Sequence, residues 1–103
     1  ELYEDAYGQW RTFFELWRFS FLDEDSNNAK KYAEKLVKLQ PEYPQSYIGY
    51  LATFEKGNNI KSMKVKLMEL LPNFSPAMIK NFHSWIREDQ ADKIIESLRR
   101  HIK

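Results

Sequence analysis

The 103 residues are 43% hydrophobic and 16% aromatic, which excludes a disordered chain and is typical of one folded domain with a modest core. The net charge of +1 excludes a strong field toward nucleic acid or membrane, although residues 1–43 hold 9 acidic and 6 basic groups and residues 44–103 hold 6 and 10. The absence of cysteine excludes a disulfide framework, a thiolate nucleophile and a zinc knuckle.

The sequence does not begin with methionine, contains no signal peptide and has no long apolar run. We therefore expect residues 1–103 to be one helical domain taken from a larger, cytoplasmic protein. We expect no membrane partner.

The first predicted element is a helix over residues 1–22. An unbroken aromatic stripe steps along it by four and three residues, which is the spacing of one helix face. Its members are Tyr3, Tyr7, Trp10, Phe14, Trp17 and Phe21. The stripe has two interpretations. Either it packs into the core, or part of it, namely Tyr3, Tyr7, Trp10 and Trp17, forms a homodimer interface, since aromatic side chains are common interface anchors.

Residues 23–28 form an acidic, polar segment that partly matches a calcium-binding loop. The segment lacks the glycine at the sixth loop position and the glutamate at the twelfth, so we expect a solvated turn and no metal. Ser26 or Asn27 is the expected N-cap of the next helix.

Two helices joined by a proline-containing turn are predicted over residues 29–58. The first ends before Pro41, because proline lacks the backbone N–H and clashes with the preceding turn. The second begins at Pro44, where a missing N–H costs nothing, and is expected to end at Gly57-Asn58.

This helix pair resembles the tetratricopeptide repeat. The residues that carry the resemblance are Ala29, Leu39, Pro41, Tyr47, Tyr50 and Phe54. Two positions depart from the family, since Leu51 stands at a small-residue position and Ala33 at an aromatic one. Gly49 and Ala52 are expected to supply small surfaces instead. The resemblance implies an all-α fold of about six helices in antiparallel pairs, forming a right-handed array.

A further helix is predicted over residues 58–71. Its buried edge consists of Ile60, Met63, Leu67 and Leu70. Lysines on its other side, Lys61, Lys64 and Lys66, are interpreted as solubilising, and we expect no nucleic-acid binding by this domain.

An internal repeat is present at a shift of 31 residues, which aligns Leu39 with Leu70 and Pro41 with Pro72. A fifth helix is predicted from Ser75-Pro76, with Met78, Phe82 and Trp85 on its core side. A sixth is predicted from Glu88-Asp89 and is interpreted as a capping helix. Its apolar residues are Ala91, Ile94, Ile95, Leu98 and Ile102, and Arg99, Arg100 and His101 suit the negative end of its own dipole.

Three segments carry a second resemblance, namely 71–75, 81–85 and 98–100. Together they resemble the end of helical-repeat regions in bacterial multidomain regulators, although His101-Ile102 departs from that family's ending. Such regulators join this region to an adenylate/guanylate cyclase-type domain or a winged-helix DNA-binding domain. The resemblance implies a sensory or protein-interaction role in signal transduction or transcription regulation.

No residue pattern indicates catalysis. His83 and His101 lie on different predicted helices without a partner at i, i+4, and the three glycines are scattered. We therefore expect no enzyme activity, no cofactor and no metal site.

Arrays of this type bind partners in a concave groove. With Pro41 as the anchor, the expected groove residues are Arg11, Phe14, Arg18, Phe21, Gln45, Ile48, Ala52, Lys56, Ile79, His83 and Arg87. Alternating apolar and basic positions favour a protein or peptide partner with acidic groups or a free carboxylate. The alternatives are a homodimer through residues 1–22, a small-ligand pocket among the aromatic side chains of the first and third predicted helices, or ordinary surface arginines over a packed core.

Overall fold

The computed structural model describes residues 6–57, 59–81 and 88–102, and every regular element within them is a helix. The elements in chain order are α1 (Ala6–Leu22), α2 (Ser26–Leu39), α3 (Pro44–Thr53), α4 (Ile60–Leu70), the 3₁₀ helix η1 (Pro76–Asn81) and α5 (Glu88–Leu98). The predicted all-α class is therefore confirmed. The right-handed tetratricopeptide-like array stays a prediction.

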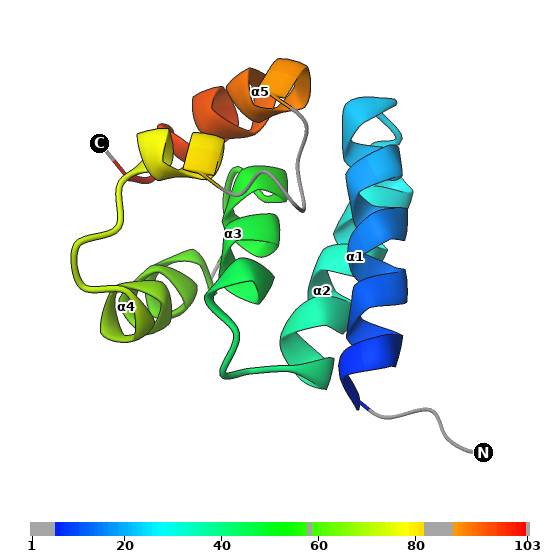
Figure 1. Cartoon of the computed structure of the whole chain (residues 1–103), viewed down its shortest axis with the longest axis horizontal. Coiled ribbons are helices and arrows are strands. Elements are labelled where there is room, and N and C mark those ends of the chain that lie inside the picture. Colours follow the sequence, from blue (N-terminus) through cyan, green and yellow to red (C-terminus); the bar gives the residue numbers. More distant parts are fainter. Residues whose placement is uncertain (1–5, 58, 82–87, 103) are drawn as a thin grey trace.

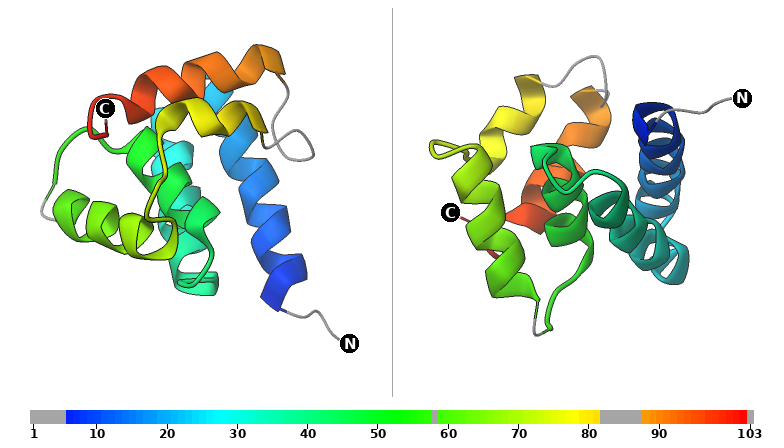
Figure 2. Two further views of the ribbon diagram at one scale, coloured as in Figure 1. Left: turned by 60° about the vertical axis from the view of Figure 1, so that its left-hand side comes forward. Right: turned by 90° about the horizontal axis from the view of Figure 1, so that it is seen from below.

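Helix α3 lies at the centre of the fold (Figure 1). Helices α1 and α2 pack on one side of it and α4 on the other, and the right-hand view of Figure 2 also separates α1 from α4. Helix α5 packs against η1 and crosses the end of α3. One buried apolar cluster joins all these elements. None of the described helices is both long and apolar enough to cross a membrane.

Helices α1 and α3 run parallel and in register. The indole N–H of Trp10 donates to Oγ of Ser46 at 2.8 Å, and the indole N–H of Trp17 donates to Oγ1 of Thr53 at 2.6 Å. Each pair is separated by 36 residues, so the two contacts advance equally along both helices. The rings are 1% and 0% exposed, so this part of the aromatic stripe is core.

Gly49 is the point where α1, α2 and α3 meet. A Cβ atom at this position would lie 3.2 Å from Cδ1 of Leu36 and 3.5 Å from Cε2 of Trp17. The separation from Leu36 is tighter than most Cβ contacts, whereas the separation from Trp17 is an ordinary van der Waals contact, so the absent side chain mainly permits the close approach of Leu36. Gly49 therefore supplies the small surface that the sequence predicted.

The turn between α1 and α2 differs from the prediction in its capping residue. Asp25 is the N-cap, and its carboxylate accepts from the backbone N–H of Asn28 at 3.3 Å, whereas Ser26 and Asn27 are already helical. An aspartate one residue earlier serves equally well, because its oxygen reaches the same free N–H groups. Glu24 adopts a φ of 61°, which reverses the chain direction here.

Helix α3 ends at Thr53 instead of continuing to Gly57-Asn58 as predicted. Two side chains from the end of the chain bind its last carbonyl groups. The guanidinium of Arg100 donates to the Ala52 carbonyl at 2.9 Å, and Nε2 of His101 lies 2.7 Å from the Phe54 carbonyl. Since a carbonyl oxygen only accepts, Nε2 of His101 carries the proton. The helix end thus combines a local bond, from the Phe54 N–H to the Tyr50 carbonyl, with these distant side chains.

The fifth predicted helix is a short 3₁₀ helix where it is described. Ser75 precedes it and Pro76 begins it, as the sequence predicted, but the regular structure described there ends at Asn81. The predicted core positions Phe82 and Trp85 lie outside the described residues. The sixth predicted helix is confirmed as α5, which begins at Glu88 and buries the predicted apolar side.

Ser46 joins three helices through one hydroxyl. It is fully buried, accepts from the indole of Trp10 and donates to the carbonyl of Gln40, the residue that caps α2, at 2.9 Å. Two polar groups far apart in the sequence therefore depend on one hydroxyl group. A buried donor or acceptor that loses its partner keeps its full desolvation cost.

We predict that Ser46→Ala lowers the free energy of unfolding by about 1–3 kcal/mol, because the Trp10 indole and the Gln40 carbonyl both lose a partner. The matched control is Ser62→Ala on α4, where an exposed hydroxyl donates to the Asn59 carbonyl and the change should stay within about 0.5 kcal/mol. Urea denaturation measures both as shifts in midpoint at constant slope. Equal midpoints for the two variants would contradict the joining role of Ser46.

Tyr47 is a second buried polar group of α3. Its hydroxyl donates to the Pro41 carbonyl at 2.6 Å. Burial raises the pKa of this phenol above its ordinary value of 10.0; nearby Glu42 also raises it, and the positive charge of Lys66 opposes the shift. The folded protein therefore keeps this proton at a pH where the unfolded chain loses it.

We predict that the free energy of unfolding falls as the pH rises above about 10, because only the unfolded state releases the Tyr47 proton there. Below that pH the contribution of the neutral phenol is fully present. Tyr47→Phe has no such proton, so its stability should fall less steeply over the same range. Urea midpoints between about pH 9 and pH 11 measure both slopes. Parallel slopes would refute the role of Tyr47.

Candidate functional site

The apolar members of the predicted groove lie in the core. Phe14, Ile48, Ala52 and Ile79 are all buried. A groove needs these side chains at its surface, so this part of the prediction is wrong. The physical reason is that α5 packs against α3 and, together with η1, joins the same apolar cluster, which buries these side chains.

Arg18, a predicted groove cation, instead links α1 to α5. Its side chain is only 14% exposed, and it binds the carboxylate of Glu15 at 2.7 Å and the amide oxygen of Gln90 at 3.4 Å. Because these partners occupy it, Arg18 serves packing between helices and not an open groove.

The remaining predicted groove residues do not form one surface. Arg11 is exposed on α1 and Lys56 is exposed in the loop after α3, whereas Phe21 and Gln45 are half-buried. The other two, His83 and Arg87, lie outside the described residues.

The predicted dimer interface also needs correction. Trp10 and Trp17 are buried and their indole N–H groups are occupied, so they cannot contact a second copy in this fold. Tyr3 and the side chain of Tyr7 lie outside what the structure describes. The same two indoles lie buried between α1 and α3 and are bonded to α3, at the place where the small-ligand pocket was the alternative prediction. The large apolar side chains that α1 exposes are instead Phe19, 62% accessible, and Leu16, 38% accessible.

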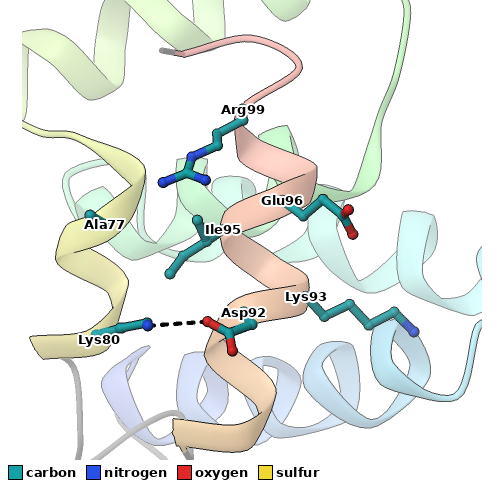
Figure 3. Close-up of a pocket in the computed structure, with 7 residues that line it drawn as sticks. All are labelled: Ala77, Lys80, Asp92, Lys93, Ile95, Glu96 and Arg99. Carbon is teal, nitrogen blue, oxygen red and sulfur yellow. Dashed lines mark ion pairs between the residues drawn. The ribbon is translucent and has the colours of Figure 1, made fainter.

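A cleft of about 480 Å³ lies between η1 and α5 (Figure 3). Its lining residues are Ala77, Lys80, Asp92, Lys93, Ile95, Glu96 and Arg99. Asp92, Ile95 and Arg99 follow at three and four residues, so the helix presents them on one side. In Figure 3 these three side chains point toward η1, whereas Lys93 and Glu96 point away from it.

The charges of this cleft differ at its two ends. At one end Lys80 and Asp92 form an ion pair at 3.3 Å. At the other end Arg99 is exposed, and its guanidinium has no hydrogen-bond or ion-pair partner in the part of the chain that the structure describes. Ile95, only 5% exposed, lies between them as an apolar floor. Among the described residues, the cleft thus offers the planar cation of Arg99 without a partner, beside an apolar surface.

Two other cations, on α5 and just after it, already donate to backbone carbonyl groups. Lys93 donates to the carbonyl of Leu22 at the end of α1, at 3.1 Å, and Arg100 donates to the carbonyl of Ala52 in α3. Arg100 was expected to serve the end of its own helix. It binds the end of α3 instead, because α5 crosses that end and leaves the Ala52 carbonyl within reach.

Metal binding has no structural basis in the described ranges. No group of three or more His, Asp or Glu side chains there is placed to hold an ion. His101 uses Nε2 for the Phe54 carbonyl, and His83 lies outside these ranges.

From the sequence, Arg99 was predicted as a charge at the C-terminal end of the sixth helix and not as part of a binding site. The spacing from Asp92 to Arg99 could have grouped these residues on one side. Nothing in the sequence tells which element covers that side, so the apolar floor was not predictable.

Comparison with known proteins adds no family. No protein-family model matches the chain, and neither curated proteins nor solved structures show a significant match to it. The resemblances to the tetratricopeptide repeat and to bacterial regulators therefore stay predictions.

The two neighbouring arginines provide a matched test of the helix cap. We predict that Arg100→Ala lowers the free energy of unfolding by about 1 kcal/mol, because the Ala52 carbonyl loses its donor. Arg99→Ala removes an exposed side chain without a partner in the described structure and should change stability by less than about 0.5 kcal/mol. Urea denaturation compares them. Equal losses would show that α3 does not depend on this cap.

Proposed function

We propose that this chain is a protein-interaction module that holds a peptide carboxylate in the cleft between η1 and α5. The observation that carries the proposal is the exposed guanidinium of Arg99, which has no partner among the described residues and lies beside the apolar floor of Ile95. The arrangement favours binding, because the described lining places a cation beside an apolar contact, while Lys80 and Asp92 already bind each other.

A carboxylate fits this cation well. The guanidinium is planar and presents parallel N–H groups, so it forms two charge-assisted hydrogen bonds to a carboxylate. A small aliphatic side chain next to that carboxylate would contact Ile95 and Ala77. The ion pair of Lys80 and Asp92 bounds the other end and leaves little net charge there. The expected ligand is therefore an acidic or C-terminal peptide segment.

The biological setting proposed for this module is a cytoplasmic bacterial signalling or transcriptional regulator. This setting rests on the sequence resemblance alone. The parallel, in-register packing of α1 and α3 supports a repeat-like scaffold, because repeats place equivalent helices side by side. The partner would be a protein, and nucleic-acid contact is not part of the proposal.

The test uses a hexapeptide ending in Ala-Val with a free carboxylate and the same peptide with a C-terminal amide. We expect the free acid to shift amide resonances of η1 and α5 in a ¹H–¹⁵N titration, and the amide form to bind at least about tenfold more weakly. Arg99→Gln should weaken binding of the free acid by a similar factor. The control, Arg11→Gln, changes an exposed arginine of α1 and should leave binding unchanged.

Either of two results would reject the carboxylate cleft. One is equal binding of the acid and amide peptides. The other is unchanged binding by Arg99→Gln together with resonance shifts away from η1 and α5.

A further inference from the structure

The outward face of α4 is apolar and basic. Val65 is 50% exposed and points away from Leu67, the fully buried residue of this helix. Around Val65 lies an open cleft of about 460 Å³ that Lys61, Lys64 and Met68 line with Glu69. Lys61 and Lys64 have no partner among the described residues, whereas Lys66 on another side of the helix pairs with Glu42 at 3.4 Å.

The turn from α1 to α2 forms an apolar and acidic counterpart. The exposed ring of Phe19 and the side chain of Leu22 line a cleft of about 480 Å³ with Asp23 and Asp25. The Asp23 carboxylate has no partner in the described ranges, and Asp25 caps α2. Arg18 lies over the Phe19 ring, but its charge is matched by Glu15. The turn therefore carries a net negative charge.

The two surfaces are complementary and lie on different sides of the molecule. Each exposes one large apolar side chain, Phe19 or Val65, beside charges of opposite sign. Figure 1 and the right-hand view of Figure 2 place α1 and α4 on opposite sides of α3, so one chain cannot join them within itself. A net charge of +1 leaves little overall repulsion between copies.

We propose that copies of this chain associate head to tail, with the α4 face of one copy on the α1–α2 turn of the next. The contact is heterologous, because it joins two different surfaces, so it generates chains or rings instead of a closed symmetric dimer. The inference is independent of the peptide cleft, since Arg99 takes no part in either surface. Arg99→Gln should therefore associate as the native protein does.

The experiment measures mass by light scattering across a hundredfold concentration range. We expect the native mass to rise with concentration past twice the 12.4 kDa of one chain, and to fall when salt screens the surface charges. Phe19→Ser and Val65→Ser each remove one apolar anchor at an exposed position. Each variant alone should remain at 12.4 kDa, and circular dichroism checks that it is folded.

An equimolar mixture of the two variants is the decisive sample. The intact α4 face of Phe19→Ser can bind the intact turn of Val65→Ser, and the resulting pair has no further complementary surface. The mixture should therefore reach twice the chain mass and stop there. Three outcomes would overturn the proposal: a native mass fixed at 12.4 kDa, a native plateau at two copies, or a mixture that does not associate.

Discussion

The fold depends on two hydrogen bonds that fix α1 against α3. The indoles of Trp10 and Trp17 are buried, and a buried indole N–H needs an acceptor. Ser46 and Thr53 provide these acceptors at the same spacing on the facing helix. A shift of α1 by one turn would remove both partners at once. Apolar packing holds the helices together, and these two bonds select one register from the several that packing would tolerate.

The position of α5 depends on the register of α1 against α3. Lys93 of α5 binds the Leu22 carbonyl at the end of α1, and Arg100, just after α5, binds the Ala52 carbonyl near the end of α3. Both carbonyl groups are set in place by the α1–α3 packing. Helix α5 also packs on α3, where the predicted groove residues Ile48 and Ala52 are buried. Because α5 packs over part of α3, the surfaces left for partners lie at the edges of the fold, at the cleft beside η1, the α4 face and the α1–α2 turn.

Local sequence signals predicted where the helices lie better than which elements pack against them. Pro41 and Pro44 placed the turn before α3, and aromatic spacing predicted α1, because both signals act within a few residues. The sequence did not show which element packs on each helix face, since Trp17 and Phe19 are both aromatic and only the fold decides which of them is buried. The functional residues were the least predictable. Arg99 and Arg100 are neighbours with similar sequence context, yet one faces a cleft and the other caps a helix 48 residues away.

The crowded position of Gly49 has a consequence for how this sequence can change during evolution. An added Cβ would lie 3.2 Å from Cδ1 of Leu36, so this side chain must move by a few tenths of an ångström, whereas the contact with Trp17 would be an ordinary one. A gain of volume at position 49 therefore favours a loss of volume at position 36. In related sequences these two positions should vary together, and alanine at position 49 should accompany a shorter aliphatic residue in place of Leu36.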